Sequence, residues 1–444
     1  MAMEPSASAT TPAGSASTTP QVERSTIIKA VGAATIGNVI EWFDYVAYSY
    51  VATAIAHNFF PKFSSTAGLI STFGILALAS VVRPLGAIVF GPMGDRVGRR
   101  KVLAITILLM SVSTAVIGVL PTFGQIGLAA PILLVLCRLV QGLSTGGEYS
   151  GATTFIAEYS PAGRRGFYCS LLSVGTRLGF LAAAGLVTLL TFLLSSAQFS
   201  SWGWRIPFLV ALPLGLIGLY LRSRLDETPE FTQVQRQGQI SEAPLRQTFT
   251  NAWSRMVLLT LALVIMQVGS YAVLTYLPTY LTSVQKLDAG RALVVTDALI
   301  VLALVLIPIS GWLSDRWGRK PVLVGASFAF AVVSYPAFML ISQKGTWSVM
   351  LGAALLGICL DVVLGASPAI IAEVFPTRLR SGGTALSYNV SVAIFGGLTP
   401  VVLTALLSST GNAYVPAYYL IVAALISVLP TLRLPLPPAR AKLN

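Results

Sequence analysis

Ionisable and amide side chains recur inside the largely apolar run RLVQGLSTGGEYSGATTFIAEYSPAGRRG at 138–166. At helical spacing, Arg138, Gln141 and Glu148 fall on one face. An arginine and a glutamate about ten residues apart lie roughly 15 Å apart along a helix axis. Such charges are costly in hydrocarbon, so they must face a protein interior or a water-filled cavity. The run is therefore a candidate wall of a transport path.

A second polar cluster lies in GNVIEWFDYVAYSY at 37–50, where Glu41 and Asp44 stand inside an apolar stretch. A carboxylate that alternates between water and a desolvated site can take up and release a proton. Glu41, Asp44 and Glu148 are therefore candidates for proton coupling. The alternative is that one of them only pairs with an arginine on a neighbouring helix. Arg138 would hold either a substrate carboxylate or a protein carboxylate, since a guanidinium binds both with paired hydrogen bonds.

The composition places these residues in membrane-spanning helices. Of 444 residues, 55% are hydrophobic and only 10% are charged, and the mean hydropathy is +0.78. Soluble domains carry about 25% charged residues. Apolar runs of about 20 residues, the length that crosses a bilayer, recur about twelve times. We predict an all-α polytopic membrane protein with twelve transmembrane helices, embedded in the lipid bilayer.

The charge balance and the scarcity of reactive side chains exclude other classes of protein. The formal net charge of +13 arises from short loops between apolar runs, which the positive-inside rule explains without nucleic acid. The chain has one histidine, His57, and three cysteines that all lie in apolar segments, so we expect neither a metal site nor a disulfide framework. There is no nucleophile elbow. We expect a transporter and not an enzyme, with no cofactor.

The basic loops all fall on one side of the predicted membrane, which places both termini in the cytoplasm. We interpret residues 1–25, rich in Ser, Thr, Ala and Pro, as a disordered tail without the apolar core of a signal peptide. The longest internal polar segment is the natural linker between two halves. The predicted parts are the tail 1–25, an N-terminal half 26–222, a cytoplasmic linker 223–253, a C-terminal half 254–434 and a C-terminal tail 435–444.

An internal repeat divides the chain into similar halves. GDRVGRRKVL at 94–103 recurs as SDRWGRKPVL at 314–323, and IAEYSPAGRRG at 156–166 recurs loosely as IAEVFPTRLRSG at 371–382. Two six-helix halves related by a pseudo-twofold axis along the membrane normal bind substrate between them and expose it alternately by rocking. The sequence therefore predicts alternating access.

The two repeated loops resemble the D-R-x-G-R-[RK] motif of the major facilitator superfamily. Within that superfamily the chain is similar to the metabolite:proton symporter family, through GNVIEWFDY, RPLGAIVFGPMGDRVGRRK, RLVQGLSTGGEYSGA, AEYSPAGRRG and SWGWRIPF. The resemblance implies a proton-coupled symporter in a bacterial inner membrane that imports a small zwitterion of the proline or betaine type. It favours the proton over sodium as coupling ion. A small carboxylate such as α-ketoglutarate or citrate is the alternative substrate, and Arg83, Arg138 and Arg177 would suit such an anion. The oligomeric state is left open.

A substrate with a cationic nitrogen would be stabilised by aromatic faces. The aromatic candidates are Trp42, Tyr45, Tyr48, Tyr271, Tyr276 and Tyr388, and the polar candidates are Asn38, Arg138, Gln141, Arg177 and Asp361. The alternative for any single aromatic residue is ordinary packing. Arg177, Asp297 and Asp361 stand where the resemblance implies uncharged residues, and either bind substrate or form a structural ion pair.

The repeated loops supply the candidates for a cytoplasmic gate. Asp95 can accept hydrogen bonds from a helix N-terminus or an arginine of the other half, and Arg99 can pair with Glu158. By resemblance, these contacts hold the cytoplasmic side closed in the outward-open state. The predicted gate residues are Asp95, Arg99, Arg100 and Glu158, with Asp315, Arg319 and Glu373 as their counterparts.

Overall fold

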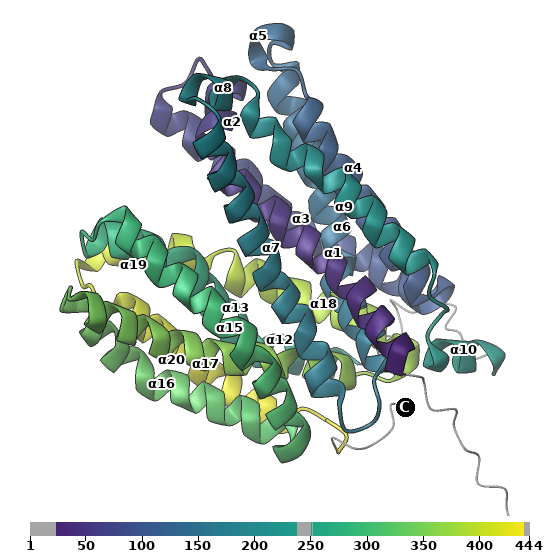
Figure 1. Ribbon diagram of the computed structural model, residues 1–444. Helices are drawn as coiled ribbons and strands as arrows, with labels where there is room; N and C mark the ends of the chain where they lie inside the picture. Colours follow the sequence, from purple (N-terminus) through teal and green to yellow (C-terminus); the bar gives the residue numbers. More distant parts are fainter. Residues whose placement is uncertain (1–23, 238–249, 251, 439–444) are drawn as a thin grey trace, which may run out of the picture.

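The computed structural model describes residues 24–237, 250 and 252–438, and within this part of the chain every regular element is a helix (Figure 1). Eleven of its helical segments are long and apolar enough to cross a membrane. The remaining spanning helix is α1 (Arg24–Tyr50), which carries Lys29, Glu41 and Asp44 and is correspondingly less apolar. Its 27 residues extend about 40 Å, and it packs against α6, α7 and α9. The prediction of twelve transmembrane helices is confirmed.

The first six spans form one bundle. They are α1, α3 (Ser65–Val97), α4 (Arg99–Val119), α6 (Ala129–Tyr159), α7 (Arg165–Leu193) and α9 (Ile206–Ser223). The shorter α2 (Ala52–Phe59), α5 (Phe123–Ile126), α8 (Ser196–Ser201) and η1 (Gly203–Arg205) lie between them.

The second six spans form the other bundle, in which two spans are broken into segments. The seventh consists of α12 (Trp253–Ala262), α13 (Val264–Ser270), η2 (Tyr271–Tyr276), α14 (Leu277–Thr279) and η3 (Tyr280–Val284). The eleventh consists of η4 (Thr377–Leu379), α18 (Arg380–Ser391), η5 (Val392–Gly396) and α19 (Thr399–Thr410). The continuous spans are α15 (Ala289–Trp317), α16 (Arg319–Ser342), α17 (Thr346–Glu373) and α20 (Val415–Arg433).

The repeated motif forms the same turn in both halves. Gly98 joins α3 to α4 with φ 104°, and Gly318 joins α15 to α16 with φ 98°. A side chain rarely adopts this backbone conformation, so the motif needs glycine at both positions. The turn reverses the chain at once and places the aspartate and the arginine of each motif on adjoining helix ends. It therefore accounts for the close spacing of charges in the motif.

The two bundles meet at the end of the molecule that carries these turns, here called the basic-loop face. There α15 and α17 pack on α7, and α18 packs on α3 and α6. Figure 1 shows the bundles converging toward the end that carries α10 (Pro229–Arg236), while α2, α5 and α8 lie apart from α19 at the opposite end. The halves are thus closed together at the basic-loop face and separated at the other.

The predicted half boundaries lie close to the helix ends. The segment 26–222 spans α1 to α9, and 254–434 spans α12 to α20. The predicted linker contains α10, and its residues 238–249 and 251 lie outside the described part of the chain. Residues 1–23 and 439–444, which make up most of the two predicted tails, also lie outside it.

Candidate functional site

Two adjoining hollows lie between the halves and share Trp42, Arg83 and Tyr271 in their walls. The first is formed mainly by the N-terminal half. Its walls are Glu41, Trp42, Asp44, Tyr45, Leu76, Ala79, Ser80, Arg83, Met110, Arg138, Gln141, Gly142, Thr145 and Tyr271. The second draws on both halves. Its walls are Trp42, Arg83, Tyr149, Ser173, Thr176, Arg177, Met266, Gln267, Ser270, Tyr271, Leu274, Leu364, Tyr388 and Val392.

The predicted carboxylates Glu41 and Asp44 both line the first hollow, and each is paired with an arginine. Glu41 Oε1 accepts a hydrogen bond from Arg83 Nη2, and Glu41 Oε2 has no partner among the described residues. Asp44 accepts from Arg138 Nη1 at 2.6 Å and from Gln141 Nε2 at 3.1 Å. Both pairs are almost completely buried, yet they border open space. Each carboxylate therefore has a counter-ion and a face toward the hollow.

Arg138 is held by an aromatic ring as well as by Asp44. Its guanidinium lies 3.8 Å from the centroid of the Tyr48 ring, and the Tyr48 hydroxyl donates to the Thr72 carbonyl at 3.1 Å. Arg138 Nε and Nη2 have no partner in the described part of the chain. The ring and the carboxylate orient the guanidinium, while two of its donors stay available.

Arg83 lines the first hollow and contacts Asn389 of the other half; the sequence analysis considered Arg83 only as suited to an anionic substrate and did not identify Asn389. Arg83 Nε donates to Asn389 Oδ1 at 3.4 Å, and Asn389 Nδ2 donates to the Gly146 carbonyl at 2.7 Å. Asn389 lies on α18 and Gly146 on α6, so these contacts join the two halves. An arginine inside an apolar run is a signal that could have identified Arg83. An asparagine in a small-residue helix carries no such signal.

Aromatic rings dominate the second hollow. Tyr388 stacks on Tyr149 with ring centroids 4.4 Å apart, across the two halves. Trp42 stacks on Phe180 at 5.4 Å, and Tyr271 begins the π-helical segment η2. Gln267 and Ser270, both on α13, add polar groups that the sequence analysis missed. A single glutamine or serine in an apolar run is too common to be a signal.

One ion pair crosses the interface beside these rings. Arg177 Nη2 on α7 lies 3.5 Å from Asp361 Oδ1 on α17, and both side chains are buried. Arg177 lines the second hollow, and Asp361 reaches it only through Arg177. Arg177 and Asp361 thus form an ion pair, and the choice between a substrate-binding role and a purely structural role for this pair stays a prediction. Asp297 takes no part, since its side chain is exposed near the start of α15.

Several predicted site residues lie away from both hollows. Glu148 is buried and binds Arg222 and the Thr106 hydroxyl, the latter at 2.6 Å. Asn38 donates to the Leu172 carbonyl and to the Thr176 hydroxyl, both at 2.7 Å, and so ties α1 to α7. Tyr276 is packed in the core of the C-terminal half. The Tyr48 ring packs against the Arg138 guanidinium but does not line the first hollow.

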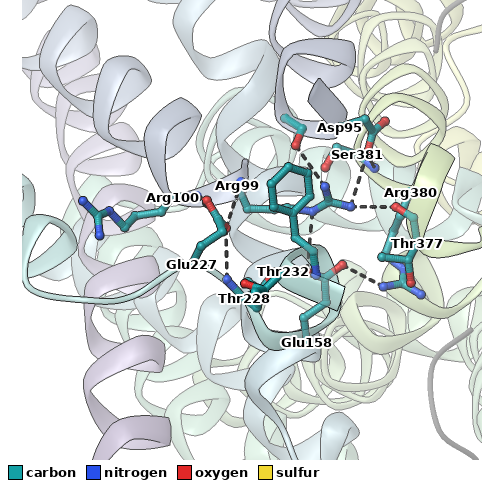
Figure 2. A network of polar contacts seen from close by, with 12 residues as sticks. Asp95, Arg99, Arg100, Glu158, Glu227, Thr228, Thr232, Thr377, Arg380 and Ser381 are labelled. Carbon is teal, nitrogen blue, oxygen red and sulfur yellow. Dashed lines mark hydrogen bonds and ion pairs between the residues drawn. The ribbon is translucent and has the colours of Figure 1, made fainter. Parts of the chain in front are cut away.

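At the basic-loop face, Asp95, Arg99, Glu158 and Arg380 form what we call the first latch (Figure 2). Asp95 accepts from the main-chain N–H groups of Ser381 at 3.1 Å and Gly382 at 2.8 Å, at the start of α18. Arg380 donates to Glu158 at 2.7 Å. The hydrogen bonds of Asp95 to Ser381 and Gly382 and of Arg380 to Glu158 join the N-terminal half to the C-terminal half. They follow the general expectation that Asp95 meets a helix N-terminus of the other half.

Arg99 sits at the centre of the first latch. It lies 3.3 Å from Asp95 and 3.5 Å from Glu158, and it donates to the Thr377 carbonyl across the interface at 2.7 Å. Its guanidinium also lies 4.9 Å from the centroid of the Phe231 ring on α10. Its two terminal nitrogens therefore both have acceptors, while Nε makes no hydrogen bond among the described residues.

The linker closes over the first latch. The Thr228 hydroxyl donates to Glu158 at 2.6 Å and caps α10, and Glu227 accepts from the main-chain N–H of Arg99 at 3.1 Å (Figure 2). The predicted gate residue Arg100 donates to the Leu225 carbonyl at 2.5 Å. Glu227 and Thr228 were not predicted, because a polar linker gives no indication of which surface it covers.

Asp315, Arg319, Glu373 and Arg165 form the second latch. Asp315 accepts from the N–H groups of Gly166 and Phe167 at the start of α7, both at 2.8 Å. Arg319 donates to Glu373 through two nitrogens, both at 3.1 Å, and to Asp315 at 2.7 Å. Arg165 approaches Glu373 at 3.8 Å. In the described residues, no group of three or more His, Cys, Asp or Glu side chains is placed to hold a metal ion.

Comparison with known families accounts for this architecture. The family model described as "Sugar (and other) transporter" matches residues 29–251 and 236–435, which is nearly the whole chain. The chain belongs to this transporter family. It is therefore a secondary transporter and not an enzyme, and the resemblance to the major facilitator superfamily is confirmed.

Curated relatives of this transporter carry closely related names. It is 41% identical over 410 residues to the glycine betaine/proline/ectoine/pipecolic acid transporter OusA of Dickeya dadantii, covering 90% of this chain and 82% of that one. It is 40% identical over 412 residues to the proline/betaine transporter of Escherichia coli K12, with the same coverage. A putative proline/betaine transporter of Staphylococcus haemolyticus is 41% identical over 412 residues, covering 91% of this chain and 87% of the relative.

Solved structures share the fold of this transporter at low identity. The proton:xylose symporter XylE bound to 6-bromo-6-deoxy-D-glucose superposes with a TM-score of 0.78 at 18% identity, covering 94% of this chain and 98% of XylE. An inward-open conformation of XylE from E. coli gives a TM-score of 0.65 at 16% identity, covering 94% and 98%.

Proposed function

We propose that this transporter is a proton-coupled symporter that imports a small zwitterion of the proline or betaine type across a bacterial inner membrane. The observation that carries the proposal is the buried cavity between the halves, in which arginine–carboxylate pairs and aromatic rings line the same space. Relatives of about 40% identity that bear the name proline/betaine transporter support the choice of substrate class.

The charge balance of the cavity favours a zwitterion over the alternative carboxylate substrate. Three arginines line the hollows, which by themselves would suit an anion. Each of them is paired with a carboxylate, Arg83 with Glu41, Arg138 with Asp44 and Arg177 with Asp361. The three pairs cancel the positive charge. An electrically neutral ligand with both signs of charge fits such a site, because it adds no uncompensated charge to a buried space.

We assign proton coupling first to Asp44 and Glu41. Both line the first hollow, where a proton from water can reach them, and both sit in ion pairs that substrate can disturb. Protonation of a carboxylate removes the negative charge from its ion pair and so changes the charge balance that a bound substrate meets, which links proton uptake to substrate binding. Glu148 was predicted for the same role, but we give it a structural part. It lies outside both hollows and is held by Arg222, which also binds main-chain carbonyls.

The cationic end of the substrate would lie among the aromatic rings. Trp42 and Tyr271 belong to both hollows, Tyr45 to the first and Tyr388 to the second. Aromatic faces attract quaternary ammonium groups, with a free energy that reaches about 2 kcal/mol when the site is desolvated. Since the rings come from both halves, a bound cation would draw the halves together.

The two latches would act as the cytoplasmic gate in this mechanism. With both latches formed, the basic-loop face is closed and the path opens to the other side. We propose that the basic-loop face is cytoplasmic, because it gathers the basic loops, and that both termini lie there. The end of the described chain supports this, since α20 ends beside Lys320 of the second repeated motif.

Uptake into proteoliposomes tests the proposal. Labelled glycine betaine, proline, α-ketoglutarate and citrate are offered with an inward proton gradient, and again after an uncoupler has removed it. We expect accumulation of betaine or proline above equilibrium only with the gradient. Accumulation of the dicarboxylate or tricarboxylate alone would show the alternative function, and uptake unaffected by the gradient but dependent on sodium would overturn proton coupling.

A coupling variant locates the proton site. Asp44→Asn should abolish gradient-driven accumulation while substrate exchange across the membrane continues, because exchange needs no net proton movement. The matched control is Asp226→Asn, which changes an exposed aspartate after α9 and should leave both activities unchanged. Full accumulation by Asp44→Asn would remove this residue from the coupling mechanism.

A further inference from the structure

The Arg177–Asp361 pair leaves hydrogen-bonding atoms of both partners unused, whereas in the Arg138–Asp44 pair both carboxylate oxygens accept hydrogen bonds. Its single contact is 3.5 Å long, while Arg177 Nε and Nη1 and Asp361 Oδ2 have no partner in the described part of the chain. Both side chains are about 98% buried or more. A buried guanidinium with unsatisfied N–H groups is costly, so such a group in a native structure needs an explanation.

Arg319 in the second latch shows what a satisfied pair looks like in the same protein. It donates through Nε, Nη1 and Nη2 to two carboxylates and a hydroxyl, at distances from 2.7 to 3.1 Å. Nothing comparable surrounds Arg177. The two pairs also differ in place, since Arg319 lies at the basic-loop face and Arg177 in the wall of the second hollow.

The second hollow, which Arg177 lines, suits a zwitterion whose carboxylate binds the guanidinium. The second hollow brings Trp42, Tyr271 and Tyr388 into the same wall as the guanidinium. Gln267 also lines it, and its Nε2 has no described partner. A carboxylate bound by Arg177 in this hollow would therefore share its walls with the aromatic rings, which attract an attached ammonium group.

We infer that Arg177 binds the substrate carboxylate through the nitrogens that Asp361 leaves free, and that Asp361 restricts the site to zwitterions. The inference rests on the proposed function and names its specificity-determining residue. With a ligand bound, two carboxylates share one guanidinium. A zwitterion compensates the second carboxylate with its own cation, whereas a simple carboxylate leaves an excess negative charge in a buried site.

The test compares two ligands of the same shape. 3,3-Dimethylbutanoate has a quaternary carbon where glycine betaine has its positively charged nitrogen, and the two are otherwise identical. The ratio of the affinity for betaine to that for dimethylbutanoate therefore measures the preference for the cation. Binding is measured by competition with labelled betaine on the purified full chain in proteoliposomes. We expect wild type to prefer betaine by about 100-fold, and Asp361→Asn to lower this ratio by about tenfold or more, mainly through tighter binding of dimethylbutanoate.

Three further variants keep the result decisive. Asp361→Glu keeps the charge and should preserve the wild-type ratio, and Asp297→Asn removes an exposed acid of the same half and should also preserve it. If Asp361→Asn does not fold, the double variant Arg177→Gln with Asp361→Asn leaves no unpaired buried charge. It should bind both ligands weakly, with a betaine preference about tenfold or more below that of wild type, because only the aromatic rings still favour the cation.

The outcomes separate this inference from the proposed function. Wild type that binds neither betaine nor proline would overturn the proposed function. Wild type that binds betaine, together with an unchanged ratio in Asp361→Asn, would overturn only the role of Asp361, because a purely structural ion pair would weaken both ligands equally. An unchanged ratio in the folded double variant would have the same meaning.

Discussion

The two latches of the basic-loop face follow one plan but differ in what crosses between the halves. In both, an aspartate accepts two main-chain N–H groups at the start of a helix in the other half. In the first latch, the glutamate also pairs across the interface, Glu158 with Arg380 at 2.7 Å. In the second, Glu373 also faces an arginine of the other half, Arg165, but at 3.8 Å, and its two close hydrogen bonds come from Arg319 of its own half. The aspartates therefore make equivalent contacts, whereas the glutamates differ in how closely they approach the arginine across the interface.

The linker adds to this difference. It follows α9 directly, so α10 reaches only the first latch, where Thr228, Glu227 and Phe231 contact Glu158, the start of α4 and Arg99. The second latch meets no such segment in the described residues. The comparison indicates that the two halves form latches on the same plan, and that the linker adds contacts to the first latch alone among the described residues.

One measurement serves all the predictions that follow. Ala385 on α18 is buried in a cluster with Ala87 of α3, so a cysteine there is shielded while the basic-loop face is closed. Cys137, Cys169 and Cys359 are replaced first. The rate at which a membrane-impermeant maleimide, added on the basic-loop side, modifies Ala385→Cys then reports the population of the open gate.

The largest effect should come from the glutamates. Glu158→Gln removes a charged bond between the halves, and hydrogen bonds to charged groups contribute about 1.5–3 kcal/mol, so labelling should rise by about 30-fold. Glu373→Gln breaks contacts mainly within its own half, so labelling should rise by less than about threefold. An equal or larger rise for Glu373→Gln would break the comparison.

The aspartates should come next and behave alike. Asp95→Asn and Asp315→Asn each remove a charge from the N-terminus of a helix in the other half, an interaction of about 1 kcal/mol. Labelling should therefore rise by about fivefold in each variant and agree within a factor of two. A tenfold disagreement between them would show that the aspartates are not equivalent.

A smaller effect should follow from releasing the linker. Thr228→Ala loses both the hydrogen bond to Glu158 and the cap of α10, and a single such bond contributes about 1 kcal/mol. Because neither lost contact crosses between the halves, only part of this free energy, about 0.65 kcal/mol, should affect gate opening, and we expect labelling to rise by about threefold. Thr232→Ala is the matched control, since its hydroxyl donates only to the Thr228 carbonyl, and it should not change labelling. Equal labelling of the two variants would remove α10 from the gate.

The smallest effect should come from the last basic residue of each motif. Arg100 donates to the Leu225 carbonyl in a partly buried contact, and Lys320 donates to the Leu432 carbonyl in an exposed one. Arg100→Ala should raise labelling by about twofold and Lys320→Ala should leave it unchanged, since exposed contacts contribute little. A larger rise for Lys320→Ala would mean that the end of α20 also takes part in the gate.

Local patterns in the sequence predicted the spans, the repeat and most of the charged residues that matter. Apolar runs are long enough to define each transmembrane helix, and Glu41, Asp44 and Arg138 stand out because charge inside such a run is costly. The predicted pairing of Arg99 with Glu158 corresponds to an observed distance of 3.5 Å. These features need only short-range information along the chain.

The choice of partner was decided by the tertiary structure alone. Spacing on α6 put Glu148 near the face of Arg138, yet Arg222 from α9 takes Glu148 and Asp44 from α1 takes Arg138. Helical periodicity gives the direction of a side chain on its own helix. It does not give the rotation of that helix against neighbours that lie far away in the sequence. For the same reason Asn389, Gln267 and the placement of α10 on the first latch became visible only once the helices were packed.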